Sequence, residues 1–174
     1  MELQEAIRER RSVRKWLEKK IPEKTINQLI DAASWAPSSC NRQAVKILAV
    51  QEKEGREFLG RITNGGVGFA HKAPLLLLFM ADSRVYSLPV ERHTPYLDCA
   101  AAIQNLLLKA HELGLGAVWL NWCLNQKSEA ETYKRFKIPA YFTICSLVAA
   151  GYPAIKAEDI PRKPLEQFFV REKF

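Results

Sequence analysis

The segment from Tyr96 to Leu113, YLDCAAAIQNLLLKAHEL, limits the fold more than any other, because small or apolar side chains occupy nearly every face of the helix it would form. A helix that is apolar all round is a buried helix. Pro95 and Gly114 stand where helices commonly begin and end, and the polar residues between them make a membrane span a poor interpretation. We therefore expect a buried central helix at 96–113, and the small residues 100–102 would let a second helix, from another subunit, approach closely.

Length and cysteine usage place the chain among single-domain proteins. The 174 residues suffice for one domain with its own core. No apolar stretch of the signal-peptide type occurs at the N-terminus, and the four cysteines show no Cys-x-x-C or Cys/His spacing. We therefore expect free thiols in a cytoplasmic location, without zinc, an iron–sulfur cluster or any other metal.

The formal net charge of +7 admits two kinds of partner, nucleic acid and small phosphorylated ligands. One dense basic cluster stands out, formed by Arg8, Arg10, Arg11, Arg14 and Lys15. It is either a solvated helix end or a phosphate site, because arginine forks bind phosphate oxygens in pairs. No nucleic-acid fold signature accompanies it, so we expect a local phosphate site and no nucleic-acid partner.

The rest of the chain alternates helices and strands. Periodicity predicts helices at 2–10, 23–35, 52–62 and 128–136, with Ser128 as the N-cap of the last, and strands at 45–50, 75–81, 117–120 and 142–150. The continuous apolar run 75–81 is typical of a strand covered on both faces. This pattern indicates an α/β or α+β sheet covered by helices. The proline-rich tail 154–174 ends in an apolar stretch that we expect to dock on a partner.

Between the second helix and the first strand lies the polar loop APSSCNRQ, residues 36–43. It is either a connector or a site, and as a site Ser38, Ser39, Asn41 and Gln43 would face a flat polar heterocycle. The glycine-rich stretch 64–68 is neither a P-loop nor a dinucleotide fingerprint, because no Gly-Lys-Ser/Thr follows it and no strand precedes it.

Four motifs, in order along almost the whole chain, resemble the nitroreductase family of FMN-dependent flavoproteins. They are Arg10-Arg11-Ser12-Val13-Arg14; Ala36-Pro37-Ser38-Ser39-x-Asn41-x-Gln43; Asp98 with Gln104-Asn105-Leu106 and Gly114-Leu115-Gly116-x-x-Trp119; and Gly151-Tyr152-Pro153 with Arg162-Lys163-Pro164-Leu165. The resemblance implies a single domain of three α/β/α layers (α+β class) with a mixed sheet, whose tail 154–174 wraps the partner subunit of a homodimer.

The resemblance also implies two FMN sites at the dimer interface. Arg10, Arg11, Ser12 and Arg14 would hold the phosphate, the ribityl chain and the flavin edge, and Arg162 would complete the phosphate site. Pro37, Ser38, Ser39 and Asn41 would come from the partner, with Gln43 also counted among the cofactor-binding residues, and the loop of Asn121, Trp122, Cys123 and Leu124 would line the flavin.

The activity implied is that of an oxidoreductase. It would take hydride from NADH or NADPH onto flavin N5 and reduce a nitroaromatic, a quinone or a similar small electron acceptor. The cofactor would carry the chemistry, with no catalytic side chain beyond electrostatic support from Arg14. The alternative is a flavin-binding carrier or sensor without turnover. Two departures from the family, Ala44-Val45 after Gln43 and the short segment 82–95 before the central helix, predict an open pocket.

Overall fold

The computed structural model describes residues 1–122 and 125–173. Its helices are α1 (Leu3–Glu9), α2 (Glu23–Ser34), α3 (Lys53–Ile62), α4 (Thr94–Glu112) and α5 (Gln126–Phe136), and its strands are β1 (Val45–Val50), β2 (Leu75–Asp82), β3 (Gly116–Asn121) and β4 (Phe142–Gly151). The alternation of helices and strands predicted from the sequence is therefore confirmed. None of these helices is long and apolar enough to cross a membrane, within the residues searched.

The four strands form one sheet in the order β1-β2-β4-β3, and each neighbouring pair is antiparallel. The mixed character expected of the sheet is thus confined, in the described part of the chain, to an isolated parallel bridge between Ser12 and Ala117. This bridge lies on the outer edge of β3 and attaches the segment after α1 to the sheet. The first functional motif is consequently positioned by β3.

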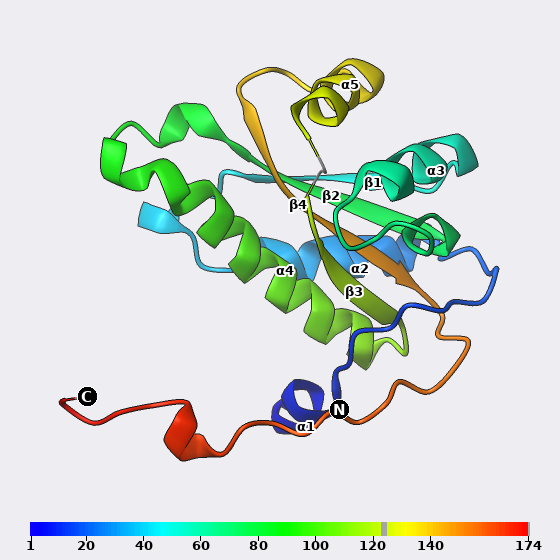
Figure 1. Ribbon diagram of the computed structural model, residues 1–174, viewed down its shortest axis with the longest axis vertical. Coiled ribbons are helices and arrows are strands. Elements are labelled where there is room, and N and C mark those ends of the chain that lie inside the picture. Colours follow the sequence, from blue (N-terminus) through cyan, green and yellow to red (C-terminus); the bar gives the residue numbers. More distant parts are fainter. Residues whose placement is uncertain (123–124, 174) are drawn as a thin grey trace.

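Helices cover both faces of the sheet, as the resemblance implied: α2 and α4 lie on one side, α3 and α5 on the other (Figure 1). Strand β2 explains why, since its side chains alternate between the two layers. Leu75, Leu77 and Phe79 join the core beneath α2 and α4, whereas Leu76 and Leu78 join the core beneath α3. Burial on both faces accounts for the uninterrupted apolar sequence of this strand.

Helix α4 is the longest helix, but one chain buries only one of its faces. Cys99, Ala102, Ile103, Leu106 and Ala110 are buried in the core. Leu97, on the opposite face, is 66% exposed, and Tyr96, in the first turn of the helix, is 48% exposed. Burial on every side is therefore not achieved within the described part of the chain, where α4 packs mainly against α2 and the sheet.

The ends of the helices follow local chemistry. Gly114 adopts φ +72° just after α4, the left-handed conformation expected of a residue in that place. The cap of α5 differs from the expectation. Asn125 is the N-cap and its side-chain oxygen accepts the Ser128 N–H at 3.0 Å, so that Ser128 lies inside the helix. Asparagine is as strong a cap as serine, and the helix begins earlier because the cap does.

The C-terminal tail leaves the body of the molecule. Its first residues pair with the segment after α1, since the Leu17 N–H donates to the Tyr152 carbonyl at 2.9 Å and the Ala154 N–H to the Lys15 carbonyl at 3.0 Å. Residues 158–173 are all exposed, and the tail extends alongside α1 into open space (Figure 1).

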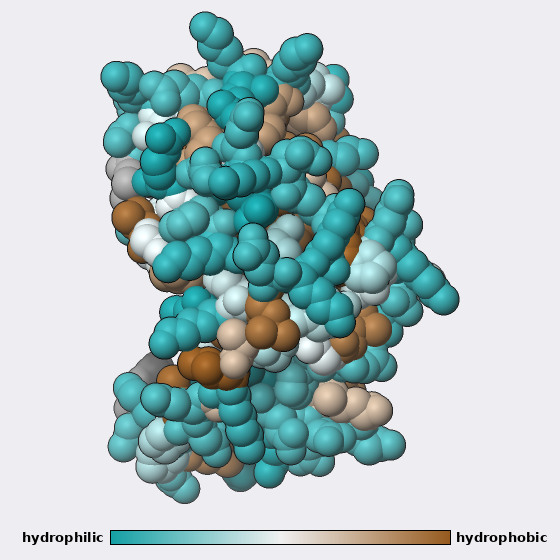
Figure 2. Space-filling view, turned by 90° about the vertical axis from the view of Figure 1, so that its right-hand side faces the viewer, coloured by the Kyte–Doolittle hydropathy of each residue, from teal (hydrophilic) through white to brown (hydrophobic). Residues whose placement is uncertain are grey.

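The face drawn in Figure 2 carries mostly hydrophilic side chains, interrupted by separate apolar patches.

Candidate functional site

The basic cluster predicted from the sequence lies along the outer edge of β3. The Val13 N–H donates to the Ala117 carbonyl at 3.1 Å, next to the Ser12–Ala117 bridge. The Val13 side chain is buried in the core, whereas the neighbouring Ser12 and Arg14 are exposed. Gly116 makes this close approach possible, because a Cβ added there would lie 2.6 Å from the Cβ of Val13. Strand β3 thus fixes the backbone of the arginine motif, and the side chains of Ser12 and Arg14 remain exposed to solvent.

Two arginines of the predicted phosphate site stand close enough to interact electrostatically and have no counter-ion in the described part of the chain. Burial, followed by the positive charges of Arg162 and Arg11, lowers the pKa of the half-buried Arg10 guanidinium below its ordinary value. Within residues 1–122 and 125–173, neither Arg10 nor Arg162 donates a side-chain hydrogen bond or forms an ion pair. Uncompensated cations at one place repel each other, and an anion bound between them would remove that repulsion.

A hollow of about 530 Å³ adjoins Arg10. Its charged lining comes from Arg10, Arg11 and Lys156 together with Glu9 and Asp159. Leu107 on α4 and Leu115 just beyond that helix give it an apolar side. Its size is within the range of small-molecule sites. The combination of an apolar wall and Arg10, which forms no ion pair in the described part of the chain, suits an organic ligand that carries an anionic group.

Arg11, also predicted to hold the cofactor, is engaged differently. Its Nε donates to Asp159 Oδ1 at 3.1 Å, and a second nitrogen also binds this carboxylate. The remaining terminal nitrogen donates to the carbonyl oxygens of Arg10, at 3.0 Å, and Arg8. The contact with Arg11 holds the pKa of Asp159 below its usual value. Sequence reasoning did not find Asp159, for which the exposed tail offers no motif.

The polar loop forms a second, separate group of predicted residues. Its short 3₁₀ turn (Ser39–Asn41) contains Cys40 at φ 51° and Asn41 at φ 54°, and Gln43 follows at φ 52°. Such left-handed backbone is costly for a residue other than glycine, least so for asparagine. Two hydrogen bonds support it: the Gln43 N–H donates to Ser38 Oγ at 2.9 Å, and the Ser39 N–H donates to Asp98 Oδ1 at 3.0 Å.

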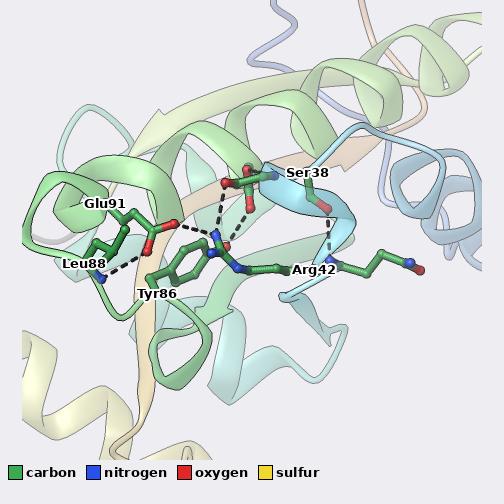
Figure 3. A network of polar contacts seen from close by, with 8 residues as sticks. Ser38, Arg42, Tyr86, Leu88 and Glu91 are labelled. Carbon is green, nitrogen blue, oxygen red and sulfur yellow. Dashed lines mark hydrogen bonds and ion pairs between the residues drawn. The ribbon is translucent and has the colours of Figure 1, made fainter.

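Asp98, on α4, is the centre of the network that holds this loop. Figure 3 shows the Arg42, Tyr86 and Glu91 side chains of this network close together. Asp98 is only 6% exposed, and besides the Ser39 N–H it accepts the Tyr86 hydroxyl at 2.7 Å. Burial and this carboxylate raise the pKa of Tyr86. Arg42 donates to Ser39 Oγ at 3.1 Å and to Glu91 at 2.6 Å. In the sequence, Asp98 was recognised only as part of a motif, and nothing in the sequence indicated its contact with Tyr86.

The two groups of predicted residues lie at opposite ends of α4 (Figure 1). The polar loop contacts Asp98 near the N-terminus of the helix, whereas the hollow beside Arg10 is lined by His111 near the C-terminus. Thirteen residues of helix separate these two positions, a distance of about 20 Å. A single chain therefore does not bring Ser38, Ser39 and Asn41 to the arginine cluster.

The predicted flavin-lining loop begins at the far end of β3. Asn121 pairs with Ser146 of β4, and the Trp122 carbonyl accepts the Asn64 N–H at 2.8 Å. Cys123 and Leu124 lie outside the described residues. Five residues of strand separate Gly116 from Asn121, which corresponds to about 17 Å. The edge of β3 consequently runs from the arginine cluster to the start of this loop.

Comparison with known proteins gives one consistent result. The model of the Nitroreductase family matches residues 7–67 and 57–152. A relative from Methanothermobacter thermautotrophicus, named "Putative NADH dehydrogenase/NAD(P)H nitroreductase", is 34% identical over 158 residues, which cover 88% of this chain and 78% of the relative. FMN reductase [NAD(P)H] of Bacillus subtilis is 26% identical over 180 residues, covering 95% of this chain and 71% of the relative.

A solved structure agrees with these relatives. The crystal structure of a Desulfovibrio desulfuricans protein in complex with FMN is similar to this chain with a TM-score of 0.81 and 27% identity, and the match covers 98% of this chain and 96% of that chain. The regions that the family model matches include the arginine motif, the polar loop and the whole of α4. The chain therefore belongs to the Nitroreductase family.

Proposed function

We propose that the protein is a cytoplasmic, FMN-dependent oxidoreductase that takes hydride from NADH or NADPH and reduces a nitroaromatic, a quinone or a similar small electrophile. Membership of the family and the names of the relatives support the flavin and the nicotinamide. The single observation that carries the proposal is the pair of Arg10 and Arg162, two cations that form no ion pair within the described residues, with a hollow of suitable size beside Arg10.

The residues present fit FMN. A phosphate dianion would meet the guanidinium groups of Arg10 and Arg162, because arginine binds phosphate oxygens through paired hydrogen bonds. Ser12 and Arg14, exposed along the edge of β3, would then follow the ribityl chain toward the flavin. Bound FMN would supply the N5 atom that accepts hydride. Arg14 would place a positive charge at the flavin edge, where the protein's field favours the negative charge that develops on reduction.

The proposal includes a homodimer, because one chain holds the two halves of the site at opposite ends of α4. A second copy related by a two-fold axis would bring its polar loop to the arginine cluster of the first. The exposed face of α4 supplies an apolar contact surface, with Leu97 66% exposed. The tail supplies another, since Phe168 is 84% exposed and Leu165 is 65% exposed. Such a shared apolar interface is typical of obligate dimers.

One experiment separates an enzyme from a flavin-binding carrier or sensor. The purified protein is examined by visible spectroscopy and then mixed anaerobically with NADH or NADPH, with and without a quinone or nitro compound. The proposal expects a yellow protein that loses its absorbance with one nicotinamide and recovers it with the acceptor. A yellow protein that neither nicotinamide bleaches would leave only the carrier or sensor. A colourless protein that FMN does not restore would refute both.

A further inference from the structure

The tail is attached to the body at two places before it becomes fully exposed. The first is the backbone pairing of Lys15 and Leu17 with Tyr152 and Ala154. The second is the ion pair of Arg11 and Asp159. Beyond Asp159, no described residue of the tail makes a hydrogen bond or ion pair with the body. The ion pair is thus the last fixed point before Arg162, and three residues of extended chain reach about 10 Å.

Arg11 has almost no hydrogen-bonding capacity left for a phosphate. A guanidinium group has five N–H donors. Two of those of Arg11 are directed at Asp159, and two more at the carbonyl oxygens of Arg8 and Arg10. One donor remains, too few for the paired contact by which arginine binds phosphate. By contrast, Arg10 and Arg162 have all their donors available within the described residues.

We propose that Arg11 and Asp159 are a positioning pair, which holds Arg162 beside Arg10, and that Arg11 does not itself bind the cofactor phosphate. This inference rests on the proposed function, because FMN is the ligand whose phosphate would occupy the site. The pair is needed because Arg162 and Arg10 repel each other in the absence of the anion. Asp159 also adjusts the charge, since three arginines and one aspartate leave +2, which matches a phosphate of about −2.

A different account of the same contact predicts the opposite result. If Asp159 only occupied Arg11 until a phosphate displaced it, removal of the carboxylate would free one more arginine and would remove a negative charge near the ligand. FMN would then bind more tightly to Asp159→Ala. If the pair positions Arg162, the same substitution releases the tail and FMN binds more weakly. The sign of the change in affinity therefore decides between the two accounts.

The test compares FMN with riboflavin, which lacks the phosphate, on the full-length protein by fluorescence titration. We expect Asp159→Ala and Arg11→Ala each to weaken FMN binding about three- to fivefold. Loss of an exposed ion pair lowers the fraction of molecules in which Arg162 is held beside Arg10 by about this factor. Riboflavin affinity should not change. The double variant should be no weaker than either single variant, because both remove the same contact. Glu158→Gln removes an equal charge one residue away, where no described ion pair exists, and should bind FMN like the parent.

A second readout does not depend on FMN. In the ligand-free protein, trypsin should cleave after Lys156 several times faster in Asp159→Ala and Arg11→Ala than in the parent or in Glu158→Gln, because Lys156 lies between the two attachments. Cleavage after Arg171, beyond the pair, is the internal control. Unchanged cleavage after Lys156, or unchanged or tighter FMN binding in Asp159→Ala, would overturn the inference. A parent that binds FMN no better than riboflavin would instead contradict the phosphate site of the proposed function, and the cleavage rates would still decide whether the pair holds the tail.

Discussion

Gly116→Ala is the substitution that most directly tests how the sheet positions the proposed phosphate site. An added Cβ would lie 2.6 Å from the Cβ of Val13 and 2.6 Å from one of its methyl groups. Ordinary carbon contacts are about 3.5–4.0 Å, so the Val13 segment must move outward by roughly 1 Å. The Val13–Ala117 hydrogen bond, 3.1 Å long, would then be stretched beyond a useful length. Overpacking of this kind costs about 1–3 kcal/mol of unfolding free energy.

The same displacement should weaken FMN binding, because Ser12 and Arg14 lie on either side of Val13. Charge-assisted contacts are worth about 1.5–3 kcal/mol, and losing half of that corresponds to an affinity about three- to twelvefold lower. Stability is measured by urea unfolding of the ligand-free protein, with circular dichroism as the signal. Affinity is measured by quenching of FMN fluorescence.

Gly114→Ala is the matched control. The added Cβ meets no atom within 4 Å, but φ is +72°, so that about 1 kcal/mol of backbone strain is expected without movement of Val13. Gly114 also lines the hollow, but its added Cβ contacts no atom, so this variant should lose stability and keep most of its FMN affinity. The reasoning is refuted if Gly116→Ala is as stable as the parent, or if it is destabilised and binds FMN as the parent does.

Three further predictions concern the two ends of the site and the dimer. Arg162→Ala should weaken FMN binding roughly ten- to hundredfold in a fluorescence titration, whereas Arg14→Ala should lower the reduction potential and slow reduction by NAD(P)H at saturating FMN, because it removes a cation from the flavin edge. Equal stopped-flow reduction rates in both variants and the parent would remove Arg14 from the mechanism. Asp98→Ala should cost about 2–3 kcal/mol of unfolding free energy in urea, and Tyr86→Phe about 1 kcal/mol, since they remove two hydrogen bonds and one; equal losses would place the Asp98 contribution elsewhere. Deletion of residues 165–174 should shift the protein toward monomers in sedimentation, and a parent that is a stable monomer with tightly bound FMN would contradict the shared site.

The sequence predicted those parts of the fold that depend on local pattern. The uninterrupted apolar run of β2 requires cover on both faces, and α2 with α4 and α3 with α5 provide it. For α4 the pattern alone was insufficient. Residues apolar all round a helix must be covered, but the pattern does not state which chain covers them, and here Leu97 remains exposed on its own chain.

The candidate site shows the limit of prediction from sequence more clearly, because the arrangement of its residues depends on contacts between residues distant in sequence. Ser39 and Asp98 are 59 positions apart, and Arg11 and Asp159 are 148 positions apart. In the sequence, Arg10 and Arg11 are neighbours of one chemical type, and a motif assigns both to the phosphate. Their surroundings give them different capacities. Arg10 is half-buried and no described residue accepts a hydrogen bond from its side chain, while four donors of Arg11 are already used by the chain. Charge counting can thus locate a phosphate site, but the division between residues that bind and residues that position follows from the acceptors that the fold brings to each guanidinium group.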